Sequence, residues 1–234
     1  MKIENKSDKE EDQMFITFEG IDASGKTSLL AKLKAHVVQK NLQGKCTFTW
    51  EPGGRKSPEI QTIRHLILNK ESNLSPIAEA FLYSSARRIH LDKVILPNLA
   101  KNKVVFCDRF VDSSFAYQAF GRDLGFEKIK LLNELATDKK YPDITFILKI
   151  SYEESMERRK ARQEDEDRLE KEENSFYQKV IKGYDFLASY PEFQKRIFVI
   201  DASKNQEEIF ESVLKILKDH KTFQTHPIYK DFFS

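Results

Sequence analysis

A glycine-rich loop directly after a short apolar run constrains this chain more than any other feature. Residues 20–27 read GIDASGKT, which fits the pattern G-x-x-x-x-G-K-[ST], and they follow the apolar run MFITF at 14–18. The residues that come next place Leu29, Leu33 and Val37 on one helical face. This order of strand, tight turn and helix disfavours a chance glycine turn. It predicts a loop that binds phosphate at the positive end of a helix.

Each part of this loop has an expected role in holding a nucleoside triphosphate. Gly20 and Gly25 allow a close approach of the backbone to phosphate oxygens, which a Cβ atom would block. Lys26 is expected to reach the β- and γ-phosphates, and the Thr27 hydroxyl to bind the Mg²⁺ that accompanies ATP. The residues predicted to bind ATP are Gly20, Ile21, Asp22, Ala23, Ser24, Gly25, Lys26, Thr27 and Ser28. The loop alone leaves the chemistry open, because GTPases, ATPases and small-molecule kinases share it.

Apolar runs that alternate with helical periods predict the fold class. The runs are MFITF at 14–18, CTFTW at 46–50, VVFC at 104–107, ITFILKI at 144–150 and IFVI at 197–200. They are short and rich in β-branched or aromatic residues, which is typical of strands buried on both faces of a parallel sheet. The helical segments are 27–40, 76–95 and 206–219. We therefore expect an α/β fold with a five-stranded parallel sheet flanked by helices.

Length and composition suggest the domain boundaries and exclude some partners. The charged residues 1–13 are interpreted as a disordered extension, followed by one domain over 14–220 and a C-terminal tail over 221–234. The net charge is only +2, from 39 basic and 37 acidic residues, which argues against nucleic-acid binding. No apolar stretch has the length that a membrane span needs, and the first residues lack the apolar core of a secretion signal, so we expect a cytoplasmic protein. Cys46 and Cys107 are expected to be reduced and packed.

Polar segments follow the second and third predicted strands. Residues 51–55 read EPGGR, and residues 108–118 read DRFVDSSFAYQ. The carboxyl ends of parallel strands meet at one edge of a sheet, so both segments are expected to line one crevice. Arg109 offers a forked positive charge suited to a phosphate, with a structural salt bridge as the alternative. Asp108 is explained equally well as a buried structural carboxylate and as a group that holds Mg²⁺ through water.

Two pairs of residues with helical spacing point to the same crevice. Tyr83 and Arg87 are four residues apart, and so are Ser114 and Gln118. An aromatic ring beside a guanidinium can stack on a base and hydrogen-bond it. Taken alone, however, such a pair is more often an arrangement of surface packing.

Residues 157–173 are the most charged part of the chain, with 14 charged residues among 17. By composition alone, a solvated helical hairpin is the favoured interpretation. The alternative is a flap that carries arginines to a phosphate.

Five segments together resemble the bacterial thymidylate kinase (dTMP kinase) family. They are EGIDASGKTSLL at 19–30, EPGG at 51–54, FLYSSARRIHL at 81–91, CDRFVDSSFAYQAFGR at 107–122 and EDRLEKE at 166–172. The resemblance is collinear from about Met14 to about Asp219. It implies the P-loop nucleoside monophosphate kinase fold with a mobile lid, usually as a homodimer. It also implies the Mg²⁺-dependent reaction of ATP with dTMP to give ADP and dTDP, for dTTP synthesis.

The resemblance assigns roles in the acceptor site. Tyr83 matches an aromatic residue that stacks on thymine, and Arg87 matches an arginine that hydrogen-bonds the base. Arg64 and Arg109 match phosphate contacts, and Asp22 matches an acidic residue near the deoxyribose and the acceptor phosphate. The complete set expected to bind dTMP is Asp22, Glu51, Pro52, Arg64, Tyr83, Arg87, Arg109, Ser114, Tyr117 and Gln118.

The resemblance also gives the charged segment a role. Some family members carry a catalytic arginine in the phosphate loop, where this chain has Ala23, and others supply it from the lid. The second arrangement is implied here, with a lid at about 157–173. The lid arginines are Arg158, Arg159, Arg162 and Arg168. Arg158 and Arg162 are the preferred candidates for the catalytic arginine. The residues to which catalysis is assigned are Lys26, Arg109, Arg158, Arg162 and Asp22.

Three positions depart from the family pattern. Trp50 stands where an arginine commonly precedes EPGG, Phe110 replaces a tyrosine, and Ala86 stands where serine or threonine is frequent. None of these changes removes a group that phosphoryl transfer needs.

The implied mechanism is direct in-line transfer. The phosphate of dTMP is ionised at neutral pH, so the reaction needs alignment and charge neutralisation rather than a general base. A deoxynucleoside kinase is one rival function, although its hydroxyl acceptor would need a carboxylate base. A nucleotide-binding module without catalysis is another, although such a module has no use for the Asp-Arg motif or the lid arginines.

Overall fold

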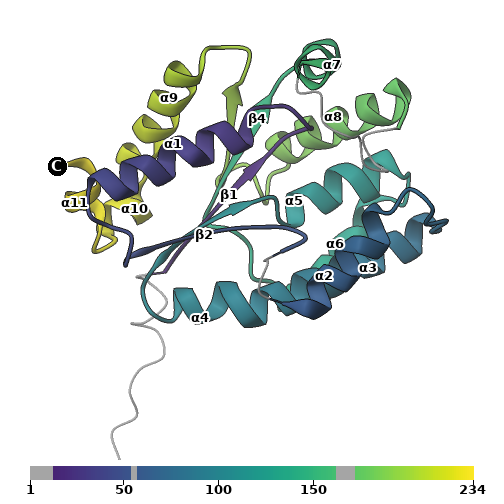
Figure 1. Ribbon diagram of the computed structural model, residues 1–234, viewed down its shortest axis with the longest axis horizontal. Helices are drawn as coiled ribbons and strands as arrows, with labels where there is room; N and C mark the ends of the chain where they lie inside the picture. The colour runs from purple at the N-terminus through teal and green to yellow at the C-terminus, as the bar shows by residue number, and fades with distance from the viewer. Residues whose placement is uncertain (1–12, 54–56, 162–171) are drawn as a thin grey trace, which may run out of the picture.

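The computed structural model describes residues 13–53, 57–161 and 172–234, and it confirms the predicted α/β fold. One sheet of parallel strands has the order β2-β3-β1-β4-β5 (Figure 1). The strands are β1 (Met14–Glu19), β2 (Cys46–Trp50), β3 (Val104–Asp108), β4 (Ile144–Lys149) and β5 (Ile197–Asp201). Each of the predicted runs forms a strand whose ends agree to within one residue.

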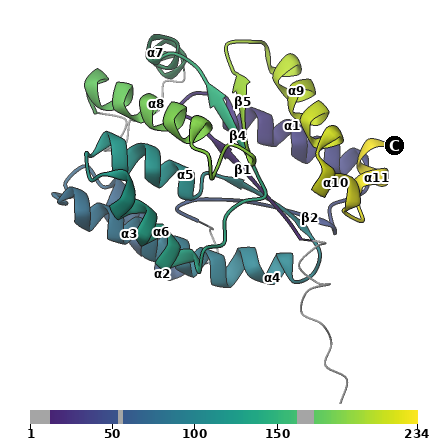
Figure 2. The ribbon, with the colours of Figure 1, turned by 180° about the vertical axis from the view of Figure 1, so that it is seen from behind.

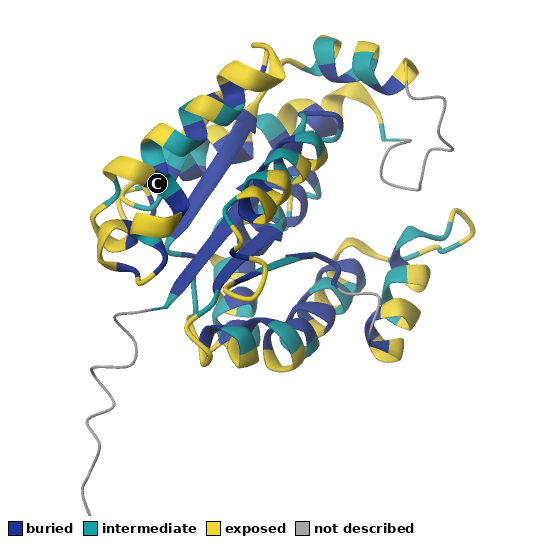
Figure 3. Cartoon of the chain, turned by 60° about the vertical axis from the view of Figure 1, so that its left-hand side comes forward, coloured by how far each residue is buried: buried dark blue, intermediate teal, exposed yellow. Residues whose placement is uncertain are grey.

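Large apolar side chains explain why β1 lies at the centre of the sheet. All six residues of β1 are buried. The Phe18 ring packs against Phe106 of β3 and Phe146 of β4, with centroids 6.3 and 5.5 Å apart. Figure 3 shows the strands as a buried layer between helices whose outer sides are exposed. The pairing of Phe18 with Asp108 brings the loop after β1 beside the segment after β3.

Helices cover both faces of the sheet. They are α1 (Lys26–Gln39), α2 (Pro58–Leu68), α3 (Pro76–His90), α4 (Leu96–Leu99), α5 (Val111–Ser114), α6 (Phe126–Thr137), α7 (Tyr152–Lys160), α8 (Asn174–Ser189), α9 (Gln206–Asp219), α10 (Lys221–Thr225) and α11 (Tyr229–Phe233). Two π-helical turns, η1 (Leu91–Ile95) and η2 (Phe115–Gly121), continue α3 and α5. Helices α1 and α9 lie together on one face, and α3, α6 and α8 lie on the other (Figures 1 and 2).

Two of the predicted segments differ from the structure. The single helix expected over 76–95 is α-helical only to His90 and then widens into the π-helical turn η1. Residues 221–234, expected as a tail, form α10 and α11, because Phe223 and Phe232 supply fully buried side chains. The backbone oxygen of Phe232 also lies 2.8 Å from His36 Nε2 on α1. Apolar contacts therefore hold this end of the chain on the domain.

The remaining predictions concern the thiols, the termini and the charged segment. Cys46 and Cys107 are buried and free, as expected. Residues 1–12 lie outside the described part of the chain, as do residues 162–171 with Arg162 and Arg168, so the extension and the lid stay predictions. Among the residues that the structure describes, no helix has the length and apolar character that crossing a membrane requires.

Candidate active site

The phosphate loop joins β1 to α1 through a backbone that glycine makes possible. Gly20 has φ +136° and Gly25 has φ +96°, a region that residues with a side chain rarely adopt. A Cβ atom on Gly20 would also lie 2.5 Å from the backbone oxygen of Leu148 on β4. The loop therefore depends on glycine at both positions, and it lays its backbone across the carboxyl end of the sheet.

Lys26 folds back over this loop. Its Nζ donates hydrogen bonds to the backbone oxygens of Gly20 at 3.1 Å and Ile21 at 3.0 Å. Burial, together with the nearby charge of Arg109, lowers the pKa of Lys26 to about 8. Thr27 is exposed in the first turn of α1. The ammonium group thus lies where a phosphate bound to the loop would compete for its hydrogen bonds.

Arg109 crosses from the end of β3 to the phosphate loop. Its Nη1 donates to the backbone oxygen of Gly20 at 2.9 Å, and its Nη2 lies 2.7 Å from Oδ1 of Asp22. The guanidinium also lies over the ring of Tyr117, 5.1 Å from its centroid. Arg109 adopts φ +66°, a strained conformation for a residue with a side chain. The neighbouring turn thus holds the charge against the loop at a cost in backbone energy.

Asp22 joins several groups at this point. Its Oδ2 accepts hydrogen bonds from the hydroxyls of Tyr117 at 3.3 Å and Tyr177 at 3.2 Å. Burial alone would raise the pKa of Asp22, but the positive charges of Arg109 and Lys26 outweigh it and lower the pKa. Asp22 therefore stays ionised between two cations.

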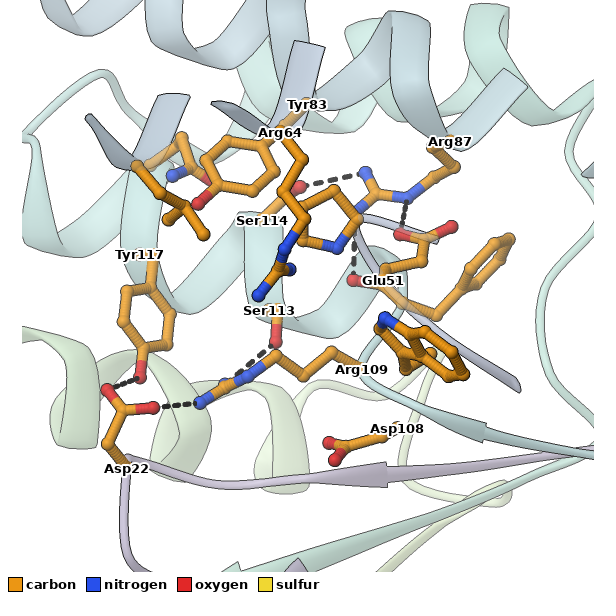
Figure 4. Close-up of a pocket in the computed structure, with 15 residues that line it drawn as sticks. Asp22, Glu51, Arg64, Tyr83, Arg87, Asp108, Arg109, Ser113, Ser114 and Tyr117 are labelled. Carbon is orange, nitrogen blue, oxygen red and sulfur yellow. Dashed lines mark hydrogen bonds and ion pairs between the residues drawn. The ribbon is translucent and has the colours of Figure 1, made fainter. Parts of the chain in front are cut away.

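A cavity of about 230 Å³, here called the main cavity, opens beside Arg109. Figure 4 shows side chains from the phosphate loop, α2, α3 and the segments after β2 and β3 around it. All ten residues that the sequence analysis expects to bind dTMP line the main cavity, and Trp50, Leu68, Asp108, Phe110 and Ser113 line it with them. The structure brings these distant segments together, while the molecule that they bind stays a prediction.

A second cavity of about 110 Å³, the loop cavity, lies over the phosphate loop and is lined by residues 22–27. It shares Asp22, Asp108 and Arg109 with the main cavity. The two cavities therefore meet at one acidic and basic cluster. This arrangement allows two anionic molecules to approach each other end to end.

Arg64 and Tyr83 reach the main cavity from two helices. Arg64 points from α2 toward Ser113, and Tyr83 presents its ring from α3 (Figure 4). Arg64 forms no hydrogen bond or ion pair with any residue in the described ranges, so its charge remains available to an anion. With Arg109, it gives this part of the cavity two cations.

Arg87 is held very differently, because it is only 2% exposed and is almost fully bonded. Its Nε donates to Oε2 of Glu51 at 2.8 Å, and its Nη1 donates to Ser114 Oγ at 2.8 Å and Asn133 Oδ1 at 2.7 Å. Its Nη2 donates to the backbone oxygen of Phe110 at 3.0 Å. An arginine has five N–H donors, so one remains. This buried network is rigid, and it fixes where the last N–H points.

Asp108 stands at the junction of the two cavities. Its Oδ1 is buried and accepts no hydrogen bond from the described residues. A buried carboxylate oxygen normally has a partner, so the structural explanation weakens and the metal-binding one gains support. Such an oxygen suits a hydrated divalent cation.

Arg158 lies apart from the main cavity. Its Nη2 donates to Ala202 O at 2.7 Å and to Glu154 Oε1 at 2.6 Å. It lines a third cavity of about 520 Å³, the side cavity, together with Ser28 and Asn205. Arg159, which the sequence analysis did not prefer, is buried with its guanidinium 5.6 Å from the ring centroid of Tyr177. Of the two described lid arginines, Arg159 therefore lies nearer to the Asp22 cluster.

Sequence reasoning missed several residues that organise the site. Glu19 accepts hydrogen bonds from the backbone N–H of Phe110 at 2.7 Å and from Ser113 Oγ at 2.6 Å and Tyr184 OH at 3.0 Å. Burial, and then the charge of Asp112, raises the pKa of Glu19 to about 7. A charged residue at the end of an otherwise apolar strand was the available signal. By contrast, Tyr184, which bonds Glu19, and Asn133, which bonds Arg87, leave no local signal in the sequence.

The departures from the family pattern have different surroundings. Trp50 lines the main cavity, whereas Ala86 is fully buried and lies outside its wall. Phe110 is buried with its ring 4.9 Å from that of Phe15 and 5.3 Å from the Arg87 guanidinium. Trp50 and Phe110 are therefore the two departures that contribute to the wall of the main cavity.

Comparison with known proteins identifies the family. The sequence model described as thymidylate kinase matches residues 18–213. The chain is 42% identical over 210 residues to the thymidylate kinase of Mycoplasmopsis agalactiae, which covers 90% of this chain and 97% of that one. It is 44% identical over 207 residues to the enzyme of Ligilactobacillus salivarius, with coverages of 88% and 97%.

A solved structure agrees with the sequence comparisons. The crystal structure of thymidylate kinase from Ehrlichia chaffeensis superposes with a TM-score of 0.71 at 32% identity, and it covers 88% of this chain and 98% of that one. The chain therefore belongs to the thymidylate kinase family, whose members phosphorylate dTMP to dTDP with ATP.

Proposed function

We propose that this chain transfers the γ-phosphate of ATP to dTMP, with dTMP in the main cavity and the ATP phosphates in the loop cavity. The observation that carries this proposal is the meeting of the two cavities at Asp22, Asp108 and Arg109. An acceptor phosphate and a donor phosphate could approach each other there, as in-line transfer requires.

The distribution of charge suggests how dTMP lies in the main cavity. Arg64 and Arg109 form its cationic end, which suits the phosphate. Tyr83 and the remaining N–H of Arg87 lie at the other end, which suits a flat base with a carbonyl oxygen. The deoxyribose would then lie near Tyr117 and Asp22, which both line the main cavity and bond each other.

The chain's own residues supply alignment and charge neutralisation. Lys26 would exchange its bonds to the loop carbonyls for bonds to the β- and γ-phosphates, and its charge would match theirs. Arg109 would contact the acceptor phosphate and release Asp22. The charge that develops during transfer would be met by an arginine of the lid, for which Arg162 stays a candidate. No group in this scheme needs to remove a proton.

Thr27 and Asp108 fit a Mg²⁺ ion carried by ATP. A hydroxyl exposed in the first turn of α1 and a carboxylate with an unpartnered Oδ1 among the described residues are oxygen ligands of the kind that Mg²⁺ prefers. Asp108 would act through a water molecule. When bound, the ion would neutralise charge on the phosphate oxygens of ATP.

The side cavity suits the nucleoside of ATP. Ala23 and Gly25 of the phosphate loop line both the side cavity and the loop cavity, and no residue of the side cavity lines the main cavity. Arg158 would contribute to this cavity as a binding residue rather than to the junction. This revises the catalytic role expected from the sequence.

We also propose that the enzyme is a homodimer, which exposed apolar side chains support. Phe81 on α3 is 55% exposed, and Leu131 and Leu135 on α6 are 60% and 69% exposed. The two helices pack on each other, so these side chains can contribute to one interface. Light scattering should give twice the chain mass, and Leu131→Lys with Leu135→Lys should give monomers. A wild-type monomer at micromolar concentrations would contradict the proposal.

A cytoplasmic location likewise stays a proposal.

An ADP-release assay over a panel of nucleotides tests the proposed reaction. ATP with Mg²⁺ is supplied with dTMP, dUMP, dCMP, dAMP, dGMP or thymidine. We expect ADP release that depends on dTMP and exceeds the release with each of the other compounds. Turnover with thymidine alone would support a deoxynucleoside kinase instead. Release that no acceptor stimulates would support a nucleotide-binding module without catalysis.

A further inference from the structure

Glu79 lies behind the wall of the main cavity and contacts one of its lining residues. It is on α3, is only 1% exposed, and does not line the cavity itself. Its Oε1 accepts a hydrogen bond from Nε2 of Gln118 at 3.0 Å. Arg122 donates to both of its oxygens, at 3.4 Å from Nε and at 3.3 Å from Nη2.

This contact fixes which end of the Gln118 carboxamide serves a bound molecule. A carboxylate paired with arginine accepts hydrogen bonds and donates none, so the Gln118 NH₂ group must face Glu79. The carboxamide oxygen accepts no bond from any described residue, and Gln118 lines the main cavity. Gln118 therefore offers the cavity an acceptor, and Arg87 offers it one N–H donor.

We propose that Glu79 is a positioning residue that sets the base preference of the main cavity by holding the Gln118 oxygen toward the bound base. This inference rests on the proposed function and deepens it. A thymine or uracil ring presents N3–H beside the C4 carbonyl oxygen, and both groups find partners in Gln118 and Arg87. Cytosine presents an unprotonated N3 beside an amino group, so both of its groups would face a mismatched partner.

The variant Glu79→Gln tests this arrangement. In the wild type, Oε1 of Glu79 accepts from both Gln118 and Arg122, and Oε2 accepts from Arg122. The variant keeps one acceptor oxygen and gains an NH₂ group, so the Gln118 carboxamide is no longer restricted to one orientation. We expect the ratio of kcat/KM for dTMP to kcat/KM for dCMP to fall about tenfold or more. The change should appear mainly as a higher KM for dTMP, because the phosphate end of the cavity is untouched.

This ratio distinguishes positioning from a general structural role. Both substrates are measured on one preparation, so loss of folded enzyme lowers both values equally and cancels. The control Glu211→Gln makes the same chemical change at an exposed site on α9 and should leave the ratio unchanged. Thermal melts of each variant report the folded fraction.

An exchange variant keeps the test decisive if the single variant fails to fold. Glu79→Gln with Gln118→Glu preserves composition and charge, reverses the hydrogen bond, and still presents an acceptor oxygen to the base. We expect this variant to prefer dTMP over dCMP as the wild type does. An unchanged ratio in Glu79→Gln, or loss of the preference in the exchange variant, would overturn the proposal alone. No turnover of dTMP by the wild type would instead overturn the proposed function, and this inference with it.

Discussion

Arg109 and Asp22 form an ion pair, with Nη2 of the arginine 2.7 Å from Oδ1 of the aspartate, where the main cavity meets the loop cavity. The pair holds a guanidinium at the place where an acceptor phosphate would arrive. Because Asp22 is one carboxylate and a phosphate dianion carries more charge, the ligand can displace it. Arg109 is thereby held in place for the acceptor phosphate, and its ion pair with Asp22 can be exchanged for one with the ligand.

Replacement of Arg109 should remove most of the activity. We expect Arg109→Ala to lower kcat by about 100-fold or more, because it removes a positioned cation from the reacting phosphates. Steady-state ADP release with saturating ATP and dTMP measures this loss. Lys179→Ala, which removes an exposed cation from α8, should retain wild-type activity. Similar kcat values for the two variants would contradict the role of Arg109.

The lowered pKa of Lys26 leads us to expect that ATP binding weakens in the alkaline range. Its pKa is lowered to about 8, so the free enzyme loses the ammonium charge as the pH rises through this value. Since ATP phosphates need that charge, kcat/KM for ATP should fall above pH 8 by up to about tenfold per pH unit. Bound phosphate stabilises the charged form, so kcat itself should hold to higher pH.

The variant Lys26→Arg identifies the titrating group. Arginine remains charged throughout this range, so a slower but pH-independent kcat/KM for ATP is expected in place of the alkaline fall. A wild-type profile that stays flat to pH 9.5 would rule out this assignment.

Loss of Glu51 should destabilise the whole domain. Glu51→Ala leaves the guanidinium of Arg87, only 2% exposed, without its anionic partner at 2.8 Å. Breaking such a buried pair costs about 3–5 kcal/mol in the free energy of unfolding, which urea denaturation measures. Glu192→Ala breaks an exposed pair with Lys130 and should cost at most about 1 kcal/mol. Equal losses would show that the Arg87 network is not a stabilising element.

Replacement of Asp108 should change the response to Mg²⁺ more than stability. We expect Asp108→Asn to raise the Mg²⁺ concentration for half-maximal activity about tenfold or more, because a ligand that orients the ion's water is weakened. The melting temperature should change little, since Oδ1 has no partner among the described residues. Asp123→Asn, at an exposed site, is the matched control. An unchanged Mg²⁺ requirement would assign Asp108 a structural role.

Local patterns in the chain were sufficient for the fold and for the phosphate loop. The five strands and the helix after Lys26 follow from runs of apolar residues and their periods, which depend on near neighbours in sequence. Gly20 and Gly25 likewise indicate a backbone conformation with positive φ, which the structure has at both positions. These patterns did not predict the two short helices at residues 221–234, where Phe223 and Phe232 pack against a surface that only the folded domain provides.

The chemical state of each side chain was decided by tertiary structure. The resemblance grouped Arg64, Arg87 and Arg109 as ligand contacts, yet their environments differ. Arg64 has no partner among the described residues, Arg87 uses four of its five N–H donors, and Arg109 is paired with Asp22. Likewise the buried Glu19 and Glu79, both far in sequence from their partners, leave no periodic signal. Sequence alone determined which residue types are present and where the strands and helices form. Only the packed fold determined burial, partners and charge, because these depend on contacts between segments that are distant along the chain.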